Sequence, residues 1–254
     1  GTVESIMKIT KEDLYTCYHT FYHPENMTLF IAGNFDEHKM MHLIEENQAK
    51  KQFDKMGKIK RTYPKEPVEV NMKDHHIHMT VTVPRCTIGI KEVVTELDKD
   101  SFLKRDLLQD MVLEYYFSQS GPFYQTLYEE GLIDDSFSFS TTLEKNFGYS
   151  LIGSNTDRPE SYAKRVKELL LSTQNATLSE DIVDTMKKKK IGELLQHMNS
   201  LETIANQYTH YHMLGLDYFE LIPKIQTLTT DDVNYFLREW ITEDRLAVCT
   251  ISAK

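Results

Sequence analysis

The chain has 254 residues, of which 40% are hydrophobic and 27% charged, a balance that is typical of a folded globular protein and excludes a disordered one. Its net charge of −10 argues against nucleic acid and anionic membranes as partners, because an acidic surface repels phosphate. The sequence contains no signal-peptide pattern and no apolar run of about 18 residues. Three well-separated cysteines form no disulfide framework, so we expect a cytoplasmic protein.

The start of the chain predicts a helix, a strand and a second helix. Thr10 precedes an acidic first turn, which is a helix-start signal, and apolar residues follow at helical spacing until Pro24. The apolar run Met27–Gly33 predicts a buried strand. A capping Asp36 starts a helix that ends near residue 50. Residues 55–73 contain one glycine, two prolines and many lysines, and they predict a linker.

The remainder of the chain predicts strands and helices in mixed order. Alternating polar and apolar residues predict a strand from residue 74 to Pro84, a second strand directly after it, and an antiparallel pair over 135–143 and 147–154. Leu246–Ser252 predicts a final strand. Helices are expected at about 99–117, 123–130, 159–173, 179–198, 200–214 and 230–240. Strands at both ends and in the middle, with helices between them, predict an α+β fold.

The two ends of the chain align without a gap at an offset of 219 residues. The identical pairs are Ile6 with Ile225, Thr10 with Thr229, and Asp13 with Asp232. Both segments present a cap, an amphipathic helix and an apolar strand in the same register, although any two capped helix–strand units share some of this pattern. A true repeat predicts a complete domain over 74–254, a linker over 55–73, and in 1–54 the end of an earlier copy whose body lies outside this sequence.

Three stretches together resemble a known family. These are GTVESIMKITKEDLYTCYHTFYHPENMTLFIAGNFD at the start, SGPFYQTLYEEGLIDDSFSFST from Ser120, and FGYSLIGSNTDRPE from Phe147. They resemble the insulinase/pitrilysin-type zinc metallopeptidases, which include the mitochondrial processing peptidases, and most of all their bacterial processing-protease-like members. The resemblance implies a mixed, mainly antiparallel sheet with helices packed on it. It also implies two such halves that enclose a chamber for an unfolded peptide.

The zinc motif of that family is missing from this sequence. The family holds zinc through an inverted HxxEH helix and a distant Glu, and the Glu of the motif acts as general base. No HxxEH occurs here. The nearest string runs from His38 to His42, with Met41 where the base would be, and a solvated helix face is the favoured interpretation. His76 and His78 share one strand face and favour a sheet edge over a ligand pair. We therefore expect no metal in this chain and zinc in the absent half.

The family's second half can contribute an Arg and a Tyr from a stretch of the form LRExGLAY. The matching stretch here runs from Leu127 to Asp134, with Tyr128 in place of the Arg and Asp134 in place of the Tyr. Tyrosine cannot make the bidentate charge-assisted bonds of arginine, and an aspartate would repel a developing oxyanion. We expect these two residues to face a substrate at most, and we assign no catalytic residue to the chain.

Two charged clusters are interpreted as ordinary surface. The run Lys187–Lys190 lies within a predicted helix and is expected to be a solvated face. The pairs Glu129-Glu130 and Asp134-Asp135 are expected to form an acidic loop, although paired carboxylates can also serve acid–base chemistry.

The sequence supports two hypotheses on function. In the first, the chain is the non-zinc half of an insulinase-type peptidase, forms part of a peptide-binding chamber, and supports proteolysis by a zinc-bearing half, so that it is inactive alone. In the second, it is a non-enzymatic scaffold or partner subunit derived from such peptidases. Both predict an unfolded polypeptide and a family partner subunit, or a second copy, as partners. The acidic charge favours basic peptides.

Overall fold

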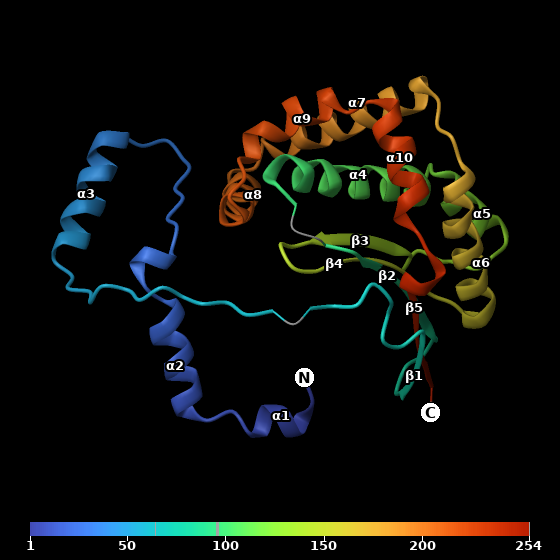
Figure 1. Cartoon of the computed structure of the whole chain (residues 1–254), viewed down its shortest axis with the longest axis horizontal. Coiled ribbons are helices and arrows are strands. Elements are labelled where there is room, and N and C mark those ends of the chain that lie inside the picture. Colours follow the sequence, from blue (N-terminus) through green and yellow to red (C-terminus); the bar gives the residue numbers. More distant parts are fainter. Residues whose placement is uncertain (64, 95–96, 254) are drawn as a thin grey trace. The chain divides into compact units, whose positions relative to one another are not determined.

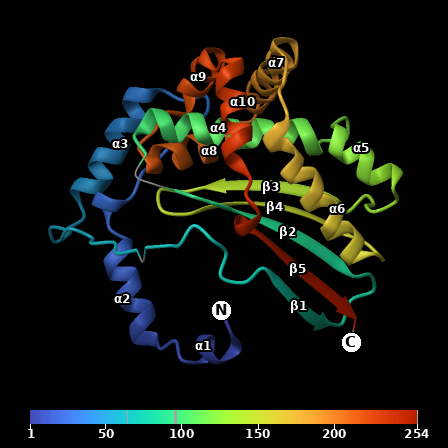
Figure 2. The same ribbon diagram turned by 45° about the vertical axis from the view of Figure 1, so that its right-hand side comes forward.

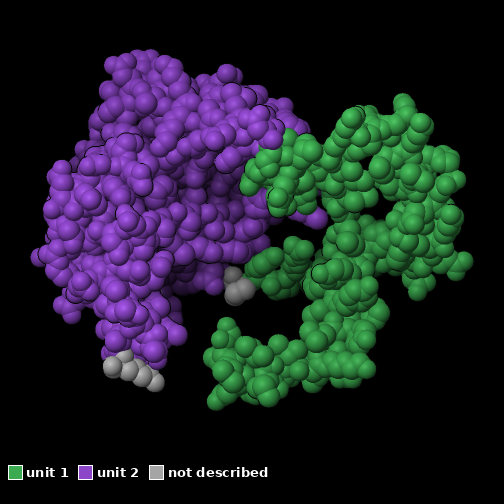
Figure 3. Space-filling model, turned by 180° about the vertical axis from the view of Figure 1, so that it is seen from behind, with its two compact units in different colours: residues 1–64, 200–209 green, residues 65–199, 210–254 purple. Residues whose placement is uncertain are grey.

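The computed structural model describes residues 1–63, 65–94 and 97–253. Pro64 of the predicted linker lies outside the described residues, as do Thr95, Glu96 and Lys254 of the predicted second domain. The chain divides into two compact units (Figure 3). Unit 1 comprises residues 1–64 and 200–209, and unit 2 comprises residues 65–199 and 210–254. None of the helices in the described ranges is both long and apolar enough to cross a membrane.

Unit 2 is built on one sheet of five strands (Figure 1). The strands are β1 (Asp74–Met79), β2 (Arg85–Glu92), β3 (Ser138–Leu143), β4 (Gly148–Asn155) and β5 (Leu246–Ala253). Their order in the sheet is β1-β5-β2-β4-β3. β1 pairs with β5 in parallel, and the other three pairings are antiparallel. The expectation of a mixed, mainly antiparallel sheet is therefore confirmed.

The helices of unit 2 cover one face of this sheet (Figures 1 and 2). They are α4 (Lys99–Phe117), α5 (Pro122–Glu129), α6 (Pro159–Ser172), α7 (Glu180–His197), α9 (Leu221–Thr227) and α10 (Thr230–Trp240). Another helix, α8 (Leu201–Leu214), contributes residues to both units. The covered face is visible in β2, where Cys86, Ile88 and Ile90 are fully buried and the residues between them are partly exposed. Alternate side chains of a strand point to opposite faces, so the partly exposed residues of β2 lie on the second face, which none of these unit 2 helices covers (Figures 1 and 2), and we call it the open face.

Helix α4 is the centre of unit 2. The carboxylate of Asp98 caps it by accepting the N–H of Ser101 at 3.0 Å. Apolar residues on several sides of the helix are buried, and so is Gln109, which donates to Ser150 of β4 at 2.7 Å. A helix that is buried on most sides must lie between two layers. Here the layers are the sheet and the helices α7, α9 and α10.

Unit 1 contains α1 (Val3–Met7), α2 (Lys11–Phe21) and α3 (Glu37–Ala49), with a short 3-10 turn over Pro24–Asn26. Thr10 and Asp36 cap α2 and α3, as the sequence predicts. The buried strand predicted over residues 27–33 is not formed, because the described residues offer no strand for it to pair with, and Met27, Leu29 and Ile31 are 57%, 67% and 40% exposed. An apolar run specifies burial, whereas a strand also requires a hydrogen-bonded neighbour.

Candidate functional site

Tyr128 and Asp134 lie on either side of the turn that joins α5 to β3. Tyr128 is 58% exposed, and its ring stacks on Tyr124 with the centroids 6.1 Å apart. The carboxylate of Asp134 accepts hydrogen bonds from the hydroxyl and the backbone N–H of Ser136, the latter at 2.9 Å, and these bonds lower the pKa of Asp134. Asp134 therefore shapes the turn, whereas Tyr128 presents its ring to solvent. In the described part of the chain, no hydrogen bond or ring contact joins these two side chains.

Two arginines from α6 and its N-terminal cap hold this turn. Gly131 adopts a φ of 62°, a conformation that favours glycine. Arg158 donates from Nη2 to the carbonyl oxygens of Glu130 and Gly131, both at 2.7 Å. Arg165 pairs with the Glu130 carboxylate at 2.8 Å. Neither arginine could be assigned to the turn from the sequence, because both lie about 30 residues away and no local pattern connects them to it. The predicted acidic loop is thus an exposed turn, and Arg165 neutralises one of its carboxylates, that of Glu130.

The open face of the sheet carries an apolar patch toward the β3–β4 hairpin, at the other end of β3 from this turn. Tyr149 and Leu151 of β4 are 39% and 38% exposed, and Phe147 in the β3–β4 hairpin is 49% exposed. The rings of Phe147 and Tyr149 stack with centroids 6.4 Å apart. Gly89 of β2 lies opposite Leu151 in the register. Because glycine has no side chain, the backbone of β2 is not covered by a side chain of its own at this position. An exposed apolar surface of this kind is suited to contact apolar side chains of another molecule.

The histidine pairs do not form a zinc site. His76 and His78 lie on β1, at the border of the sheet, with ring centroids 4.7 Å apart. Their Nε2 and Nδ1 atoms lie 2.7 Å and 3.2 Å from the same Ser252 hydroxyl oxygen. His38 and His42 are exposed on α3. In residues 1–63, 65–94 and 97–253, no three His, Cys, Asp or Glu side chains gather as a ligand set for a metal. A zinc site needs three or four such ligands, which neither histidine pair supplies within the described residues.

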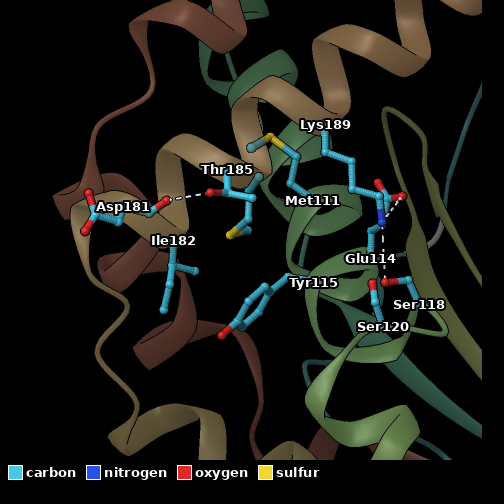
Figure 4. Close-up of a pocket in the computed structure, with 10 residues that line it drawn as sticks. Met111, Glu114, Tyr115, Ser118, Ser120, Asp181, Ile182, Thr185 and Lys189 are labelled. Carbon is cyan, nitrogen blue, oxygen red and sulfur yellow. Dashed lines mark hydrogen bonds and ion pairs between the residues drawn. The ribbon is translucent and has the colours of Figure 1, made fainter.

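A pocket of about 370 Å³ lies between α4 and α7. Figure 4 shows Lys189 bridging the polar end of the pocket, 2.9 Å from the Glu114 carboxylate and 3.4 Å from the Ser118 hydroxyl. Two methionines, a tyrosine and an isoleucine form the apolar part. The apolar lining consists of Met111, Tyr115, Ile182 and Met186.

The lysine run of α7 is not the solvated face that the sequence predicts. Lys187 donates to the carbonyl oxygens of Gln226 and Leu228 at 3.0 Å and 2.8 Å. Lys190 pairs with Asp110 of α4 and is 17% exposed. With Lys189 bound to Glu114, three of the four lysines connect α7 to its neighbours. That part of the prediction is wrong, because helix periodicity does not reveal which face meets carboxylates from distant residues.

A row of carboxylates on α4 faces these lysines. Asp106, Asp110 and Glu114 are spaced four residues apart and share one helix face. Burial raises the pKa of Asp106 to about 6, although the Tyr211 hydroxyl donates to it at 3.0 Å. On α7, burial and the neighbouring Glu114 carboxylate raise the pKa of Glu193 to about 7. These groups hold protons at a pH where ordinary carboxylic acids are ionised.

Comparison with known proteins identifies the family. Residues 8–190 match the model of the "Peptidase M16 inactive domain". The chain is 40% identical over all 254 residues to a Bacillus subtilis (strain 168) protein named "Uncharacterized zinc protease YmfH", of which it spans 59%. The chain belongs to the M16 peptidase family.

Solved structures agree with this assignment. An M16-like peptidase from Alicyclobacillus acidocaldarius superposes on the whole chain with a TM-score of 0.91 and 34% identity, and the chain spans 60% of it. A protease from Helicobacter pylori has the same fold, with a TM-score of 0.83 over 99% of the chain at 15% identity. The M16 chain described here thus spans about 60% of the length of these relatives. The resemblance stated from the sequence is confirmed, together with the fold class.

The M16 assignment agrees with the residues that this chain carries. The matched model is that of the inactive domain, and the sequence has no HxxEH. The roles of Tyr128 and Asp134 stay predictions, as do the domain boundaries at 54 and 74. The surface that the sequence did not single out is the open sheet face. The sequence signal for this face was the alternation in β2 and β4. Every second residue of these strands points to the face that no predicted helix was expected to cover.

Proposed function

We propose that this chain is the non-zinc half of an M16 peptidase, and that its open sheet face lines a chamber for unfolded peptides. The observation that carries the proposal is the apolar patch of Phe147, Tyr149 and Leu151 on the sheet face opposite to the one that the described helices of unit 2 cover. The inactive-domain match and the relative named as a zinc protease support it. Hydrolysis would then depend on a zinc-bearing half that acts together with this one.

The open face is suited to bind without sequence specificity. Exposed aromatic and aliphatic side chains can contact the apolar residues of many peptides. The net charge of −10 would attract basic peptides by steering them toward the surface. In this proposal the chain binds and orients a substrate, and it supplies no group to the reacting carbonyl.

A second candidate function is that of a non-enzymatic scaffold. It is favoured by Tyr128 and Asp134, which replace the Arg and Tyr that some family members contribute to the chamber. Asp134 is also engaged in shaping its turn. A scaffold would bind polypeptide or a partner subunit and would support no cleavage even when a zinc-bearing half is supplied.

Peptide binding and cleavage by the purified chain test the proposal. We expect the chain to bind a fluorescein-labelled unstructured basic peptide, to contain far less than one zinc per chain, and to leave the peptide intact. Addition of the zinc-bearing half of the Bacillus subtilis relative should restore cleavage. Binding without restored cleavage would favour the scaffold. Stoichiometric zinc, or cleavage by the chain alone that a chelator abolishes, would refute the proposal.

A matched pair of variants tests the sheet face itself. Tyr149→Asp places a charge on the open face, and Tyr235→Asp places one on α10, where Tyr235 is 63% exposed. Both side chains are accessible, so neither change is expected to unfold the chain. Peptide affinity should fall for Tyr149→Asp and stay unchanged for Tyr235→Asp.

A further inference from the structure

The segment over residues 50–63 has a charge opposite to that of the rest of the chain. It contains six basic residues and one acidic residue, Asp54, so that its net charge is +5. The whole chain carries −10, and the residues outside the segment therefore carry −15. The overall charge argues against anionic partners, but this segment is a local exception to it. The six basic residues are Lys50, Lys51, Lys55, Lys58, Lys60 and Arg61.

The positive charges of this segment are exposed and unpaired. All six basic residues are exposed, and within the described residues none of their side chains takes part in a hydrogen bond or an ion pair. Basic residues of unit 2 behave differently, since Lys91, Lys104 and Lys190 each pair with a carboxylate. A group of unpaired cations that lie close together in the chain creates a positive potential that attracts an anionic surface.

Unit 1 holds the first half of the segment and leaves the second half unbound. Nε2 of His23 lies 2.8 Å from the carbonyl oxygen of Asp54, and the N–H of Met56 donates to the Glu25 carboxylate at 3.4 Å. The rings of His23 and Phe53 are in contact, with centroids 5.6 Å apart. In the described part of the chain, no hydrogen bond, ion pair or ring contact holds residues 57–63. This half can therefore meet a partner without breaking such an interaction.

Apolar side chains alternate with the charges. Phe53, Met56, Ile59 and Tyr63 stand three or four residues apart, which is the spacing of one face of a helix. Phe53 and Tyr63 are 51% and 49% exposed. On an apolar surface the segment can turn these four side chains to the same side. A lipid bilayer offers such a surface, because apolar side chains enter the boundary between its headgroups and its acyl chains.

The kind of basic residue favours a bilayer over a nucleic acid. Five of the six are lysines, and only Arg61 carries the planar group that bonds phosphates in pairs and recognises base edges. Lysine is a compact charge, which suits the diffuse field of anionic headgroups. Each basic residue near such a surface raises affinity about fivefold. The six residues also reach the number of about four to eight that lipid-binding segments carry.

We propose that residues 50–63 bind the surface of a membrane that contains anionic lipids. The basic side chains are attracted to the headgroups, and the apolar side chains insert at the boundary with the acyl chains. The acidic remainder of the chain is repelled by the same headgroups, so this segment makes the contact. The inference goes beyond the proposed function and is independent of it, because it uses no residue of the open sheet face.

Sedimentation of the whole chain with lipid vesicles tests the inference. We expect binding to phosphatidylcholine vesicles with about 30% phosphatidylserine, and none to phosphatidylcholine alone. The test variant carries Lys58→Glu and Lys60→Glu. The matched control carries Lys164→Glu and Lys188→Glu, two exposed lysines of unit 2 that have no ion pair within the described residues. Both variants change the net charge equally, and circular dichroism should show that both stay folded.

Affinity for the anionic vesicles should fall roughly tenfold or more in the test variant and less than about twofold in the control. It should also weaken when salt rises from about 0.1 M to about 0.5 M, because salt screens exposed charges. Tyr63→Ser should weaken binding about threefold, since it removes an inserted ring. An unchanged affinity of Tyr63→Ser would overturn the insertion of the apolar side chains.

Three results would overturn the inference as a whole. The first is a chain that does not bind anionic vesicles. The second is an equal loss of affinity in the test variant and the control, which would show that overall charge decides binding. The third is a single-stranded oligonucleotide that displaces the chain from the vesicles and binds it more tightly, which would assign the segment to nucleic acid.

Discussion

The indole Nε1 of Trp240 donates a 2.7 Å hydrogen bond to Oε1 of Glu92. Trp240 ends α10 and is fully buried, and Glu92 ends β2 with its side chain inaccessible to solvent. The second carboxylate oxygen of Glu92 accepts from Arg105 of α4 at 2.6 Å. One carboxylate thus joins the sheet to two helices, and both of its oxygens are satisfied. This arrangement fixes how the helical layer sits on the sheet at the end of β2.

Removal of this carboxylate should be strongly destabilising. Glu92→Ala leaves the guanidinium of Arg105 and the N–H of Trp240 without their partner in a buried site. Loss of one member of a buried ion pair costs about 3–5 kcal/mol. The free energy of unfolding, measured by urea denaturation, should fall by that amount. The matched control is Glu66→Ala, which breaks the exposed Lys91–Glu66 pair and should change stability by less than about 1 kcal/mol. Equal effects of the two changes would contradict this account.

The protonated carboxyl groups between α4 and α7 predict that stability falls as pH rises. Burial raises the pKa of Asp106 from 3.8 to about 6, and burial with the neighbouring Glu114 raises that of Glu193 from 4.5 to about 7. The folded protein therefore binds protons that the unfolded chain releases. The stabilisation is fully present below about pH 4 and is lost as pH rises through 6 and 7.

Urea denaturation between pH 4.5 and pH 8 checks this dependence. Groups other than these two also titrate, so the informative quantity is the difference between variants. The free energy of unfolding should decline less steeply in both variants, because an amide does not titrate. The difference should lie between about pH 4 and 6 for Asp106→Asn, and between about pH 4.5 and 7 for Glu193→Gln. The charges that face these groups are those of Asp110, Glu114, Lys189, Lys190 and His210. A decline of the same slope in both variants would show that other groups cause it.

Local signals in the sequence predicted much of this fold. The structure places α4 at Lys99–Phe117, the range expected from the sequence. The antiparallel β3–β4 pair also follows from its turn and its alternation. The parallel pairing of β1 with β5 could not be derived, because it joins segments about 170 residues apart and no local pattern specifies such a partner.

The failures have identifiable physical causes. Helix α9 is not among the helices predicted from the sequence, and it contains Pro223 in its first turn, where proline is tolerated. The lysines of α7 were predicted to be solvated because their partners, such as Asp110, lie far away in sequence. At the candidate site, the stretch around Tyr128 and Asp134 could be located by resemblance. The arginine contacts to Glu130 and Gly131 needed the tertiary structure, whereas the alternation in β2 and β4 was a sequence signal for the open sheet face.

Helix α2 matches α10 in sequence pattern but differs from it in burial, and this difference predicts that α2 associates with another surface. Both have 11 residues and the same capping box, formed by Thr10 with Asp13 and by Thr229 with Asp232. Their apolar faces differ in environment. The α10 residues Val233, Leu237 and Trp240 are fully buried, whereas the aligned α2 residues Leu14, Tyr18 and Phe21 are 62%, 53% and 43% exposed. An exposed apolar helix face promotes association with another surface.

Phe21→Asp should therefore change association and leave stability nearly unchanged. We expect the unaltered chain to associate with increasing concentration in analytical ultracentrifugation, and the variant to do so less. The urea midpoint of unfolding should move little, because Phe21 is exposed. Trp240→Ala, at the aligned position, should instead cost about 3–5 kcal/mol, the effect of emptying a buried aromatic site. A monomeric chain at every concentration would contradict the prediction for α2.

The separate environments of Tyr128 and Asp134 predict that truncation of Asp134 lowers stability, whereas truncation of Tyr128 lowers peptide affinity. Asp134→Ala removes the acceptor of the Ser136 N–H at 2.9 Å and of its hydroxyl, so the free energy of unfolding should fall by about 1 kcal/mol. Tyr128→Ala removes an exposed ring that contacts Tyr124, and its effect on stability should be within about 0.5 kcal/mol. Peptide affinity should fall for Tyr128→Ala if its ring faces the substrate. Urea denaturation and peptide titration on the same two variants measure both quantities, and a larger loss of stability for Tyr128→Ala would refute this division of roles.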